Sequence, residues 1–255
     1  MKLFLKIAVF VLTVALITAS LVFSSRRLAR VTCGEVEVVI PDHSPRIVDR
    51  DEISRLIGNL DDGLLNRPLY AMNTEMIERG LTKIPAIKNA EVFRQFSVDH
   101  FQVKGKLVVE VEQREPLFRI LTGKENYYMD REGVRIDSRG EFTLHVLVVT
   151  GEVDEKFARE RLLPLISFMG DDAFWSAQMK QVHVVEGGEI QMVPLVGDQL
   201  VDFGEPEGYQ KKLRNLKALY EQGFAETGWA RYDRIVLKYE NQVVCTKRNG
   251  YGQKQ

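Results

Sequence analysis

The sequence predicts an α+β protein with an N-terminal transmembrane helix, a small α+β domain, and then a mixed β-rich domain with flanking helices. Three observations predict this order: a long apolar segment near the N-terminus, two amphipathic helix patterns set among alternating strand patterns, and repeated short strand patterns after residue 117. Of the 255 residues, 45% are hydrophobic and 28% are charged, which is an ordinary globular composition. A chain of this length can bury one or two cores.

Charge and cysteine content exclude several classes of protein. Lys plus Arg (35) against Asp plus Glu (36) gives a net charge of −1, which argues against a polybasic nucleic-acid binder. The two cysteines, Cys33 and Cys245, are too few for a disulfide-rich scaffold or a zinc site of four cysteines. Their distance in the sequence makes two free thiols the expectation.

The N-terminal segment is long enough to cross a bilayer. From Ile7 to Phe23 its polar residues are limited to two threonines and a serine, and about 20 apolar residues span a membrane. We expect residues 1–6 to form a short cytoplasmic N-terminus and residues 7–25 a transmembrane helix. Lysines before the segment and arginines after it leave its orientation open. A cleavable signal peptide is the alternative, although the length and the bulky end at Phe23 favour an anchor.

Residues 34–117 predict a compact α+β domain. A strand over 35–40 precedes a helix that Asp49 and Glu52 begin with a capping-box pattern, and that Gly58 and Asn59 close. A second helix starts near Asn73 or Thr74 and stops before Pro85. We expect its apolar positions and those of the first helix to form core: Ile53, Leu56, Ile57, Met76, Ile77 and Leu81. Strands over 90–96 and 107–112 follow, joined by a long polar hairpin loop over 97–106.

Residues 118–248 predict the β-rich domain, and 249–255 a flexible tail. A turn at 130–133 separates two short strands. A helix over 156–169 is expected despite Pro164, and Asp171-Asp172 resembles a cap for a short turn containing Trp175. The remaining expected elements are strands over 144–149, 179–185, 189–193, 199–203, 235–239 and 243–247, and an amphipathic helix over 209–220.

The sequence offers no catalytic, metal or cofactor site. His43, His100, His145 and His183 are isolated, and Gly187-Gly188 has too few glycines to hold a pyrophosphate. Neither a Gly-x-Ser-x-Gly elbow nor a Ser-x-x-Lys pattern occurs. Asp61-Asp62 and Asp171-Asp172 suit loop and cap positions better than paired glycosidase carboxylates. We therefore expect a protein that is not an enzyme and binds no cofactor.

Six segments of the sequence carry a resemblance to a known family: 34–40, 81–92, 109–116, 128–134, 148–151 and 234–239. Their order along the chain resembles the FtsQ/DivIB family of bacterial cell-division proteins, in which a membrane span precedes a POTRA domain (strand-helix-helix-strand-strand) and a β domain. The resemblance covers nearly the whole chain, and it differs at Gln113, where family members often have Glu. Two further departures are the inserted hairpin residues 97–106 and the short segment before the span.

The resemblance implies a non-catalytic scaffold in the inner membrane. Such proteins hold the coiled-coil membrane proteins FtsB and FtsL at the division septum, and they link early divisome components to septal peptidoglycan synthesis. It also implies a cytoplasmic N-terminus and a periplasmic bulk. A different reading, a periplasmic POTRA-type assembly or secretion factor, stays open, as does the less favoured membrane-anchored cell-wall hydrolase.

The last strand is the expected partner site. No later strand pattern covers it, so its outer backbone groups suit strand addition by a partner. The alternative is that Lys247 and Arg248 only protect an ordinary sheet edge from aggregation. The residues expected at the partner surface, partly through the family resemblance, are Lys238, Tyr239, Val243, Val244, Cys245, Thr246 and Lys247.

Overall fold

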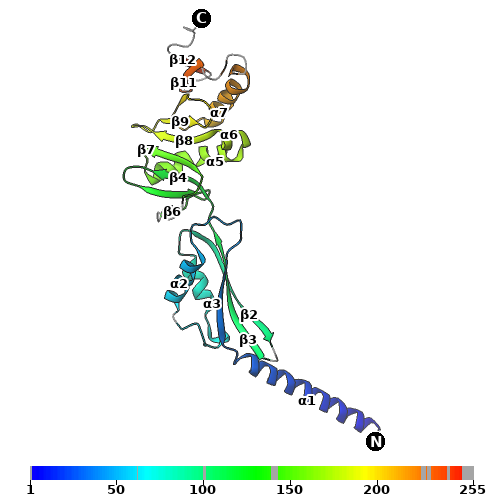
Figure 1. Cartoon of the computed structure of the whole chain (residues 1–255). Coiled ribbons are helices and arrows are strands. Elements are labelled where there is room, and N and C mark those ends of the chain that lie inside the picture. Colours follow the sequence, from blue (N-terminus) through cyan, green and yellow to red (C-terminus); the bar gives the residue numbers. More distant parts are fainter. Residues whose placement is uncertain are drawn as a thin grey trace. The chain divides into compact units, whose positions relative to one another are not determined.

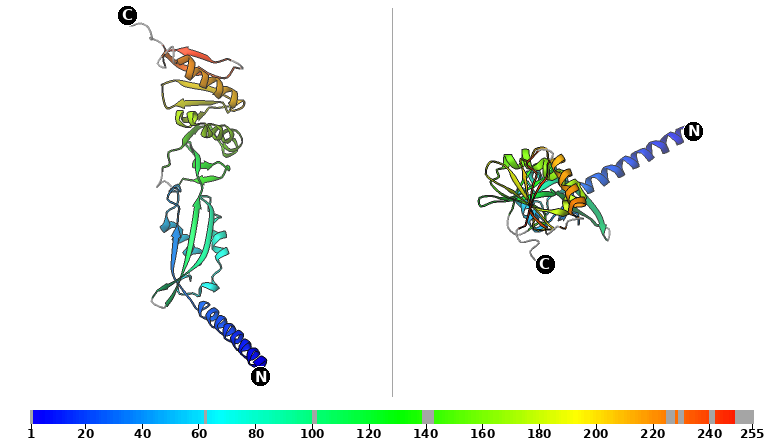
Figure 2. Two further views of the ribbon diagram at one scale, coloured as in Figure 1. Left: turned by 90° about the vertical axis from the view of Figure 1, so that its right-hand side faces the viewer. Right: turned by 90° about the horizontal axis from the view of Figure 1, so that it is seen from above.

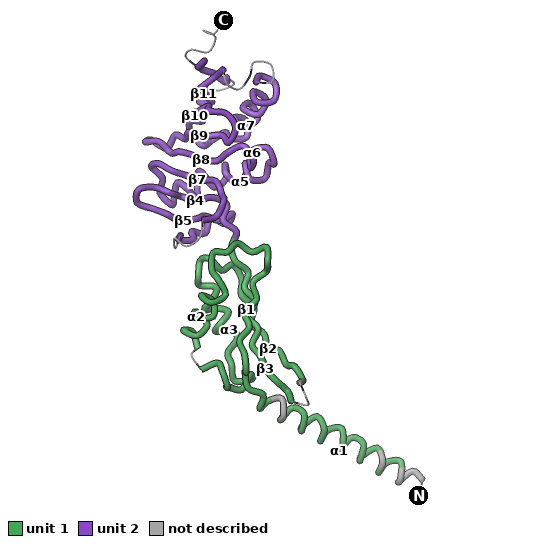
Figure 3. The backbone as a smooth tube through the Cα atoms, viewed as in Figure 1, with its two compact units in different colours: residues 1–114 green, residues 115–255 purple. Residues whose placement is uncertain are grey.

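A computed structural model of the whole chain describes residues 2–61, 63–99, 102–138, 143–224, 228, 231–239 and 242–248. It divides into two compact units, Met1–Arg114 and Glu115–Gln255, which Figure 3 distinguishes by colour. The expected tail over 249–255 lies outside the described residues. Each unit is described by itself below.

Unit 1 begins with the long helix α1 (Lys2–Leu28). Its segment Lys6–Arg26 is the one helix in the described part of the chain that is long and apolar enough to cross a membrane. The large apolar side chains described along this segment, such as Phe10, Leu16 and Phe23, are exposed. An apolar helix whose described side chains are exposed fits an apolar surrounding such as a bilayer.

The rest of unit 1 is a three-stranded sheet covered by two helices. The strands β1 (Cys33–Val39), β2 (Ile87–Asp99) and β3 (Gln102–Gln113) lie in the order β1-β3-β2, with β1 parallel and β2 antiparallel to β3. Between β1 and β2 come α2 (Arg50–Leu60), the 3-10 turn η1 (Leu69–Ala71) and α3 (Thr74–Leu81). The predicted order strand, helix, helix, strand, strand is thus confirmed (Figure 1).

The two helices begin where the sequence predicts. The Asp49 carboxylate accepts a hydrogen bond from the Glu52 amide at 2.7 Å, and the Asn73 side chain accepts one from the Met76 amide at 3.1 Å. Two details of the prediction are wrong. Gly58 and Asn59 do not close α2, which continues to Leu60 because its exposed last turn needs no left-handed residue. Met76 is 40% exposed and is not core, unlike Ile77 and Leu81 on the same helix.

The polar segment over 97–106 is not the predicted long loop. Its described residues, 97–99 and 102–106, extend both strands of the hairpin, with Ser97 paired to Lys104, Val98 to Val103 and Asp99 to Gln102. Cross-strand pairing supplies hydrogen-bond partners for the backbone N–H and C=O groups of these residues, so polar side chains do not require a loop here. The insertion therefore lengthens the β2–β3 hairpin as a ribbon.

Unit 2 is built on a nine-stranded mixed sheet with the order β12-β11-β10-β9-β8-β7-β4-β5-β6. Parallel neighbours need crossover connections, and here helices supply two of them, between β7 and β8 and between β10 and β11. Both sets of helices lie on the same side of the sheet (Figure 1). The strands are β4 (Pro116–Leu121), β5 (Asn126–Asp130), β6 (Arg135–Asp137), β7 (Leu147–Gly151), β8 (Met179–Val184), β9 (Ile190–Pro194), β10 (Leu200–Gly204), β11 (Tyr232–Val236) and β12 (Val244–Lys247).

The first crossover contains a widened turn. It runs through α4 (Glu155–Phe157), a π-helical turn η2 (Ala158–Leu162), α5 (Leu163–Asp171) and α6 (Ala173–Gln178). The Leu163 amide donates to the Ala158 carbonyl, and the next residue, Pro164, stands in the first turn of α5. Proline has no backbone N–H group, and its ring clashes with the preceding turn of a regular helix. The wider π turn accommodates Pro164, so the predicted helix continues past this residue. Asp172 caps α6, as predicted.

The second crossover is α7 (Tyr209–Ala218), followed by a π turn η3 (Leu219–Gly223). Its buried Leu213 and Leu216 face the core of unit 2, which also contains Phe118, Trp175 and Phe203. This apolar contact fixes the helix against the sheet.

Two predicted strands of unit 2 have bounds that differ from the structure by more than one residue. The strand predicted over 144–149 begins only at Leu147, where its pairing with Phe118 starts. The strand predicted over 235–239 is β11, which runs from Tyr232 to Val236 because its parallel partner β10 pairs only with residues 234–236.

Candidate functional site

The last strand, β12, lies at the end of the unit 2 sheet (Figures 1 and 2). It pairs antiparallel with β11, where Cys245 lies opposite Ile235 and Val244 opposite Val236. No described strand pairs with its other edge. The outer backbone groups of β12 are therefore in a position where a further strand can add.

The direction of the amides along β12 follows from one backbone hydrogen bond. The Arg248 amide donates to the Arg231 carbonyl at 2.9 Å, while the adjacent Lys247 is paired with Tyr232. Because amide direction alternates along a strand, the Thr246 amide points toward β11, and those of Cys245 and Lys247 point to the outer edge. The outer edge thus presents at least two donors to a strand laid beside it.

The side chains of β12 divide between the two faces of the sheet. Val243, just before the strand, and Cys245 are partly buried against the core, whereas Val244 is 42% exposed and Thr246 and Lys247 are exposed. Burial raises the pKa of the Cys245 thiol and so favours its neutral form. β12 is held to unit 2 by one apolar face and by its ladder with β11.

The strand beside β12 is held by an ion pair between a half-exposed arginine and a buried carboxylate. Arg234 on β11 contacts the carboxylate of Asp202 on β10, and Gln191 on β9 donates to the same carboxylate at 2.9 Å. Burial of Asp202 tends to raise its pKa, but the hydrogen bonds from Arg234 and Gln191 outweigh that effect and hold the pKa below its usual value. These contacts link the side chains of β9, β10 and β11, the three strands next to β12.

Lys238 and Tyr239 follow β11 rather than lying on it as predicted. The Lys238 ammonium contacts the Glu189 carboxylate, and its stem packs over Gly204, whose φ of +75° and missing Cβ leave room for it. Tyr239 is 60% exposed. The Lys238 side chain is thus held just after the end of β11, and the Tyr239 side chain next to it is exposed.

Beside them is a small hollow of about 280 Å³ that the sequence does not predict. Lys211 and Lys212 at the start of α7 line it together with Lys238 and Tyr239. Lys212 donates to the Glu205 carbonyl at 2.7 Å and to the Phe203 carbonyl at 3.1 Å, and burial lowers its pKa. The amphipathic pattern over 209–220 predicts the helix but not this hollow, because the pattern carries no information on which segments pack beside the helix.

The described residues include no group of three or more His, Cys, Asp or Glu side chains placed to hold a metal ion. His183 shares a hydrogen bond of 3.0 Å with Thr150 on β7. Asp61 caps α2 and pairs with Arg67 at 2.6 Å, and Asp172 caps α6. His100 and Asp62 lie outside the described residues.

These features define a class: a chain with one apolar N-terminal helix, a three-stranded α+β module, and a mixed-sheet domain that ends in an edge strand. Comparison with known families agrees with this order. A POTRA-like domain matches residues 31–99, and the domain described as FtsQ/DivIB, C-terminal related, matches residues 115–246.

The chain belongs to the FtsQ/DivIB family. The match to the C-terminal domain reaches into β12. A search among curated proteins returned no match. Membership of this family gives the protein a role in cell division, and the apolar N-terminal helix fits a single-pass membrane protein of the division machinery.

Proposed function

We propose that this protein is a non-catalytic scaffold that recruits FtsB/FtsL-type partners to the division septum. In this role it links early divisome components to septal peptidoglycan synthesis. Its N-terminus lies in the cytoplasm, α1 stays in the inner membrane as an uncleaved anchor, and both units lie in the periplasm. Its partner surface consists of Lys238, Tyr239, Val243, Val244, Cys245, Thr246 and Lys247.

The observation that carries this proposal is the position of β12 at the end of the sheet, inside the domain by which the family is recognised. A partner segment that adds as a tenth strand receives hydrogen bonds from the outward amides of Cys245 and Lys247. Main-chain pairing supplies affinity, and exposed side chains beside it supply specificity. Val244, Thr246 and Tyr239 are exposed in this region.

This edge has two devices of edges that are protected against aggregation, a short strand and a lysine, and it lacks two others. The devices it lacks are prolines and bulges that twist the edge strand away. The segment over 243–247 has one charged residue, Lys247, at its end and no proline. Its irregularity of register falls between Tyr232 and Arg234 on β11, so β12 itself keeps a regular outer edge.

The test is a pull-down from crosslinked dividing cells with the full chain as bait and a second bait lacking residues 243–255. We expect small coiled-coil division proteins with the full chain only. Because Val243 and Cys245 touch the core, a thermal melt of the truncated bait must first show cooperative unfolding. Capture by a folded truncated bait contradicts the edge site, and recovery of outer-membrane assembly factors in place of division proteins contradicts the scaffold role.

Catalysis is tested separately. The full chain in detergent is incubated with purified peptidoglycan, with a known muramidase as the positive control. We expect no soluble muropeptides above the buffer blank. Their release would contradict the non-catalytic role, whatever the pull-down shows.

A further inference from the structure

The register of the unit 1 sheet places the β2–β3 hairpin at the end of the sheet from which α1 departs. β1 begins at Cys33, shortly after α1 ends at Leu28, and it runs parallel to β3 with Cys33 opposite Gly105. Gln102, Val103 and Lys104 precede Gly105 on β3. At about 3.3 Å per residue, the hairpin therefore projects about 10 Å past the start of β1, toward the side on which α1 lies.

The linker between α1 and β1 is short enough to bring this hairpin to the bilayer surface. A fully extended chain covers at most about 3.5 Å per residue, so Leu28 and Cys33 are no more than about 17 Å apart. The projection of the hairpin spans more than half of this distance. This argument depends on α1 as a membrane anchor and on the pairing of β1 with β3, and it does not depend on partner binding at β12.

One face of the projecting ribbon is apolar and extends past the part of the sheet on which the helices pack. Val98 and Val103 lie directly opposite each other, and by the alternation of strand residues they share the face of the buried Leu107 and Val109. Phe96 lies on the same face, and the centroid of its ring is 6.4 Å from that of the Tyr70 ring. Val98 is 75% exposed and Val103 is 38% exposed. The core face of the sheet thus continues into an uncovered apolar end.

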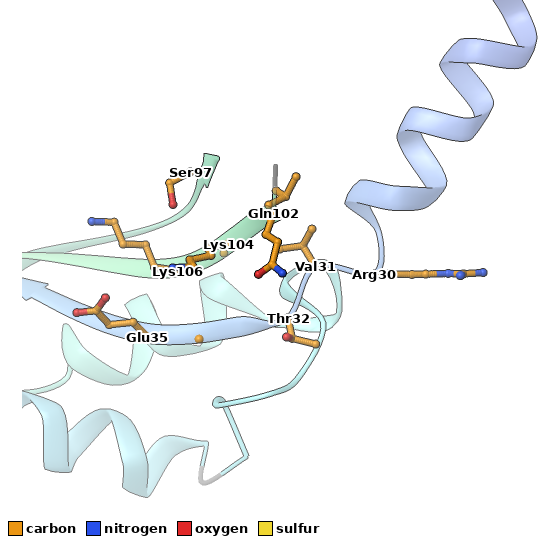
Figure 4. Close-up of a pocket in the computed structure, with 11 residues that line it drawn as sticks. Arg30, Val31, Thr32, Glu35, Ser97, Gln102, Lys104 and Lys106 are labelled. Carbon is orange, nitrogen blue, oxygen red and sulfur yellow. The ribbon is translucent and has the colours of Figure 1, made fainter. Parts of the chain in front are cut away.

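The opposite face of the same ribbon is basic. Lys104 and Lys106 lie opposite Ser97 and Gln95 on β2, and Lys106 pairs with Glu37 on β1. A surface hollow of about 630 Å³ lies here, and its charged lining residues are Arg30, Lys104, Lys106 and Glu35. Figure 4 shows the two lysines on β3, Glu35 on β1, and Arg30 extending away from the other labelled side chains.

We infer that the projecting end of the β2–β3 hairpin, with Arg30, is a membrane-surface site that binds the headgroups of anionic lipids. Val98 and Val103 enter the interfacial layer, while the long stems of Lys104 and Lys106 let their ammonium groups stay at headgroup level. Arg30, Lys104 and Lys106 in the lining of the hollow attract the phosphate of such a lipid. The contact sets the POTRA-like module at a defined height above the bilayer.

The test uses the full chain in lipid nanodiscs, made from phosphatidylcholine alone or mixed with phosphatidylglycerol. Val98→Cys, in a Cys245→Ser background, carries an environment-sensitive fluorophore, and brominated lipids quench it if it reaches the bilayer. Cys33 is fully buried and serves as the internal check of labelling specificity. The matched control is Glu112→Cys, an exposed site near the other end of β3.

We expect strong quenching at residue 98 in the anionic nanodiscs, a clear decrease in neutral ones, and quenching at residue 112 near background in both. Arg30→Gln with Lys104→Gln should remove the part of the quenching that depends on the anionic lipid. Lys83→Gln with Lys180→Gln, which changes the net charge equally at two other exposed lysines, should not. Equal quenching at residues 98 and 112 would overturn the membrane contact, and quenching that ignores the anionic lipid would overturn the headgroup site.

Discussion

The guanidinium of Arg234 on β11 ion-pairs with the buried carboxylate of Asp202 on β10. Because β12 pairs only with β11 among the described strands, this contact supports the position of the candidate partner edge. Gln191 on β9 completes the arrangement with its hydrogen bond to Asp202. The ion pair thus joins β11, the strand that carries β12, to β10 on its other side.

Asp202→Asn should destabilise unit 2 by about 1–3 kcal/mol, since a buried charge-assisted hydrogen bond is lost. The folded-state pKa of Asp202 is lowered, so its contribution to stability is complete above the unfolded pKa of about 3.9 and is lost as the pH falls through the folded pKa. The variant should therefore lose less stability on acidification than the natural chain does. Both tryptophans, Trp175 and Trp229, belong to unit 2, so urea unfolding followed by their fluorescence from pH 7 to pH 3 checks this. Parallel pH profiles for the two chains would contradict it.

Gln113→Glu should destabilise unit 1, although the two side chains have nearly the same size. The Gln113 side chain is buried, accepts from the amides of Ile47 and Val48 at 3.0 and 2.9 Å, and donates to the Val48 carbonyl at 2.7 Å. An ionised Glu cannot donate, so we expect a loss of about 1–3 kcal/mol. Hydrogen exchange of the amides of residues 47 and 48 should accelerate in this variant. In the matched control Glu112→Gln, which changes an exposed side chain, exchange should stay as in the natural chain.

Gly151→Ala should destabilise unit 2 far more than Gly187→Ala, although both glycines have positive φ, +94° and +90°. A Cβ at residue 151 would lie 2.0 Å from the Val184 carbonyl oxygen, whereas one at residue 187 meets no atom within 4 Å. We expect a cost of about 3 kcal/mol or more for the first change and about 1 kcal/mol for the second. Thermal unfolding followed by tryptophan fluorescence measures both, and equal shifts would show that the close approach of β7 to β8 is not rigid.

The sequence predicted most elements because their local signals agree with their packing. Asp49 and Asn73 accept the hydrogen bonds expected of helix caps, and the turn at 130–133 places Gly133 at a positive φ of +76°. The apolar positions Ile53, Ile57, Ile77 and Leu81 are buried as expected. In each case a side chain or a backbone conformation acts within a few residues of its own position, so a single chain segment carries the information.

The failures occur where a distant partner decides the structure. The segment over 97–106 has the composition of a loop, but its described residues, 97–99 and 102–106, pair with the opposite strand as a ribbon. The end of β11 is set by how far β10 extends, and the passage through Pro164 depends on a π turn that no residue type announces. The candidate edge was predictable as the last strand of the chain. The lysines of α7 beside it were not, because the crossover that brings them there is a tertiary feature.

The most direct test of the account separates the outward amide of Lys247 from its side chain. Lys247→Pro removes the outward donor and leaves the ladder with β11, since that amide points away from β11 and proline is tolerated on edge strands. Lys247→Ala keeps the amide and removes the charge. Affinity for the soluble part of an FtsB/FtsL-type partner is measured by calorimetry with both variants and with the natural chain, after tryptophan fluorescence has shown equal thermal stability.

We predict that Lys247→Pro binds about tenfold or more weakly, the effect of losing one hydrogen bond and the close approach of a strand, while Lys247→Ala stays within about threefold of the natural chain. Equal affinities for the proline and alanine variants would contradict strand addition at β12.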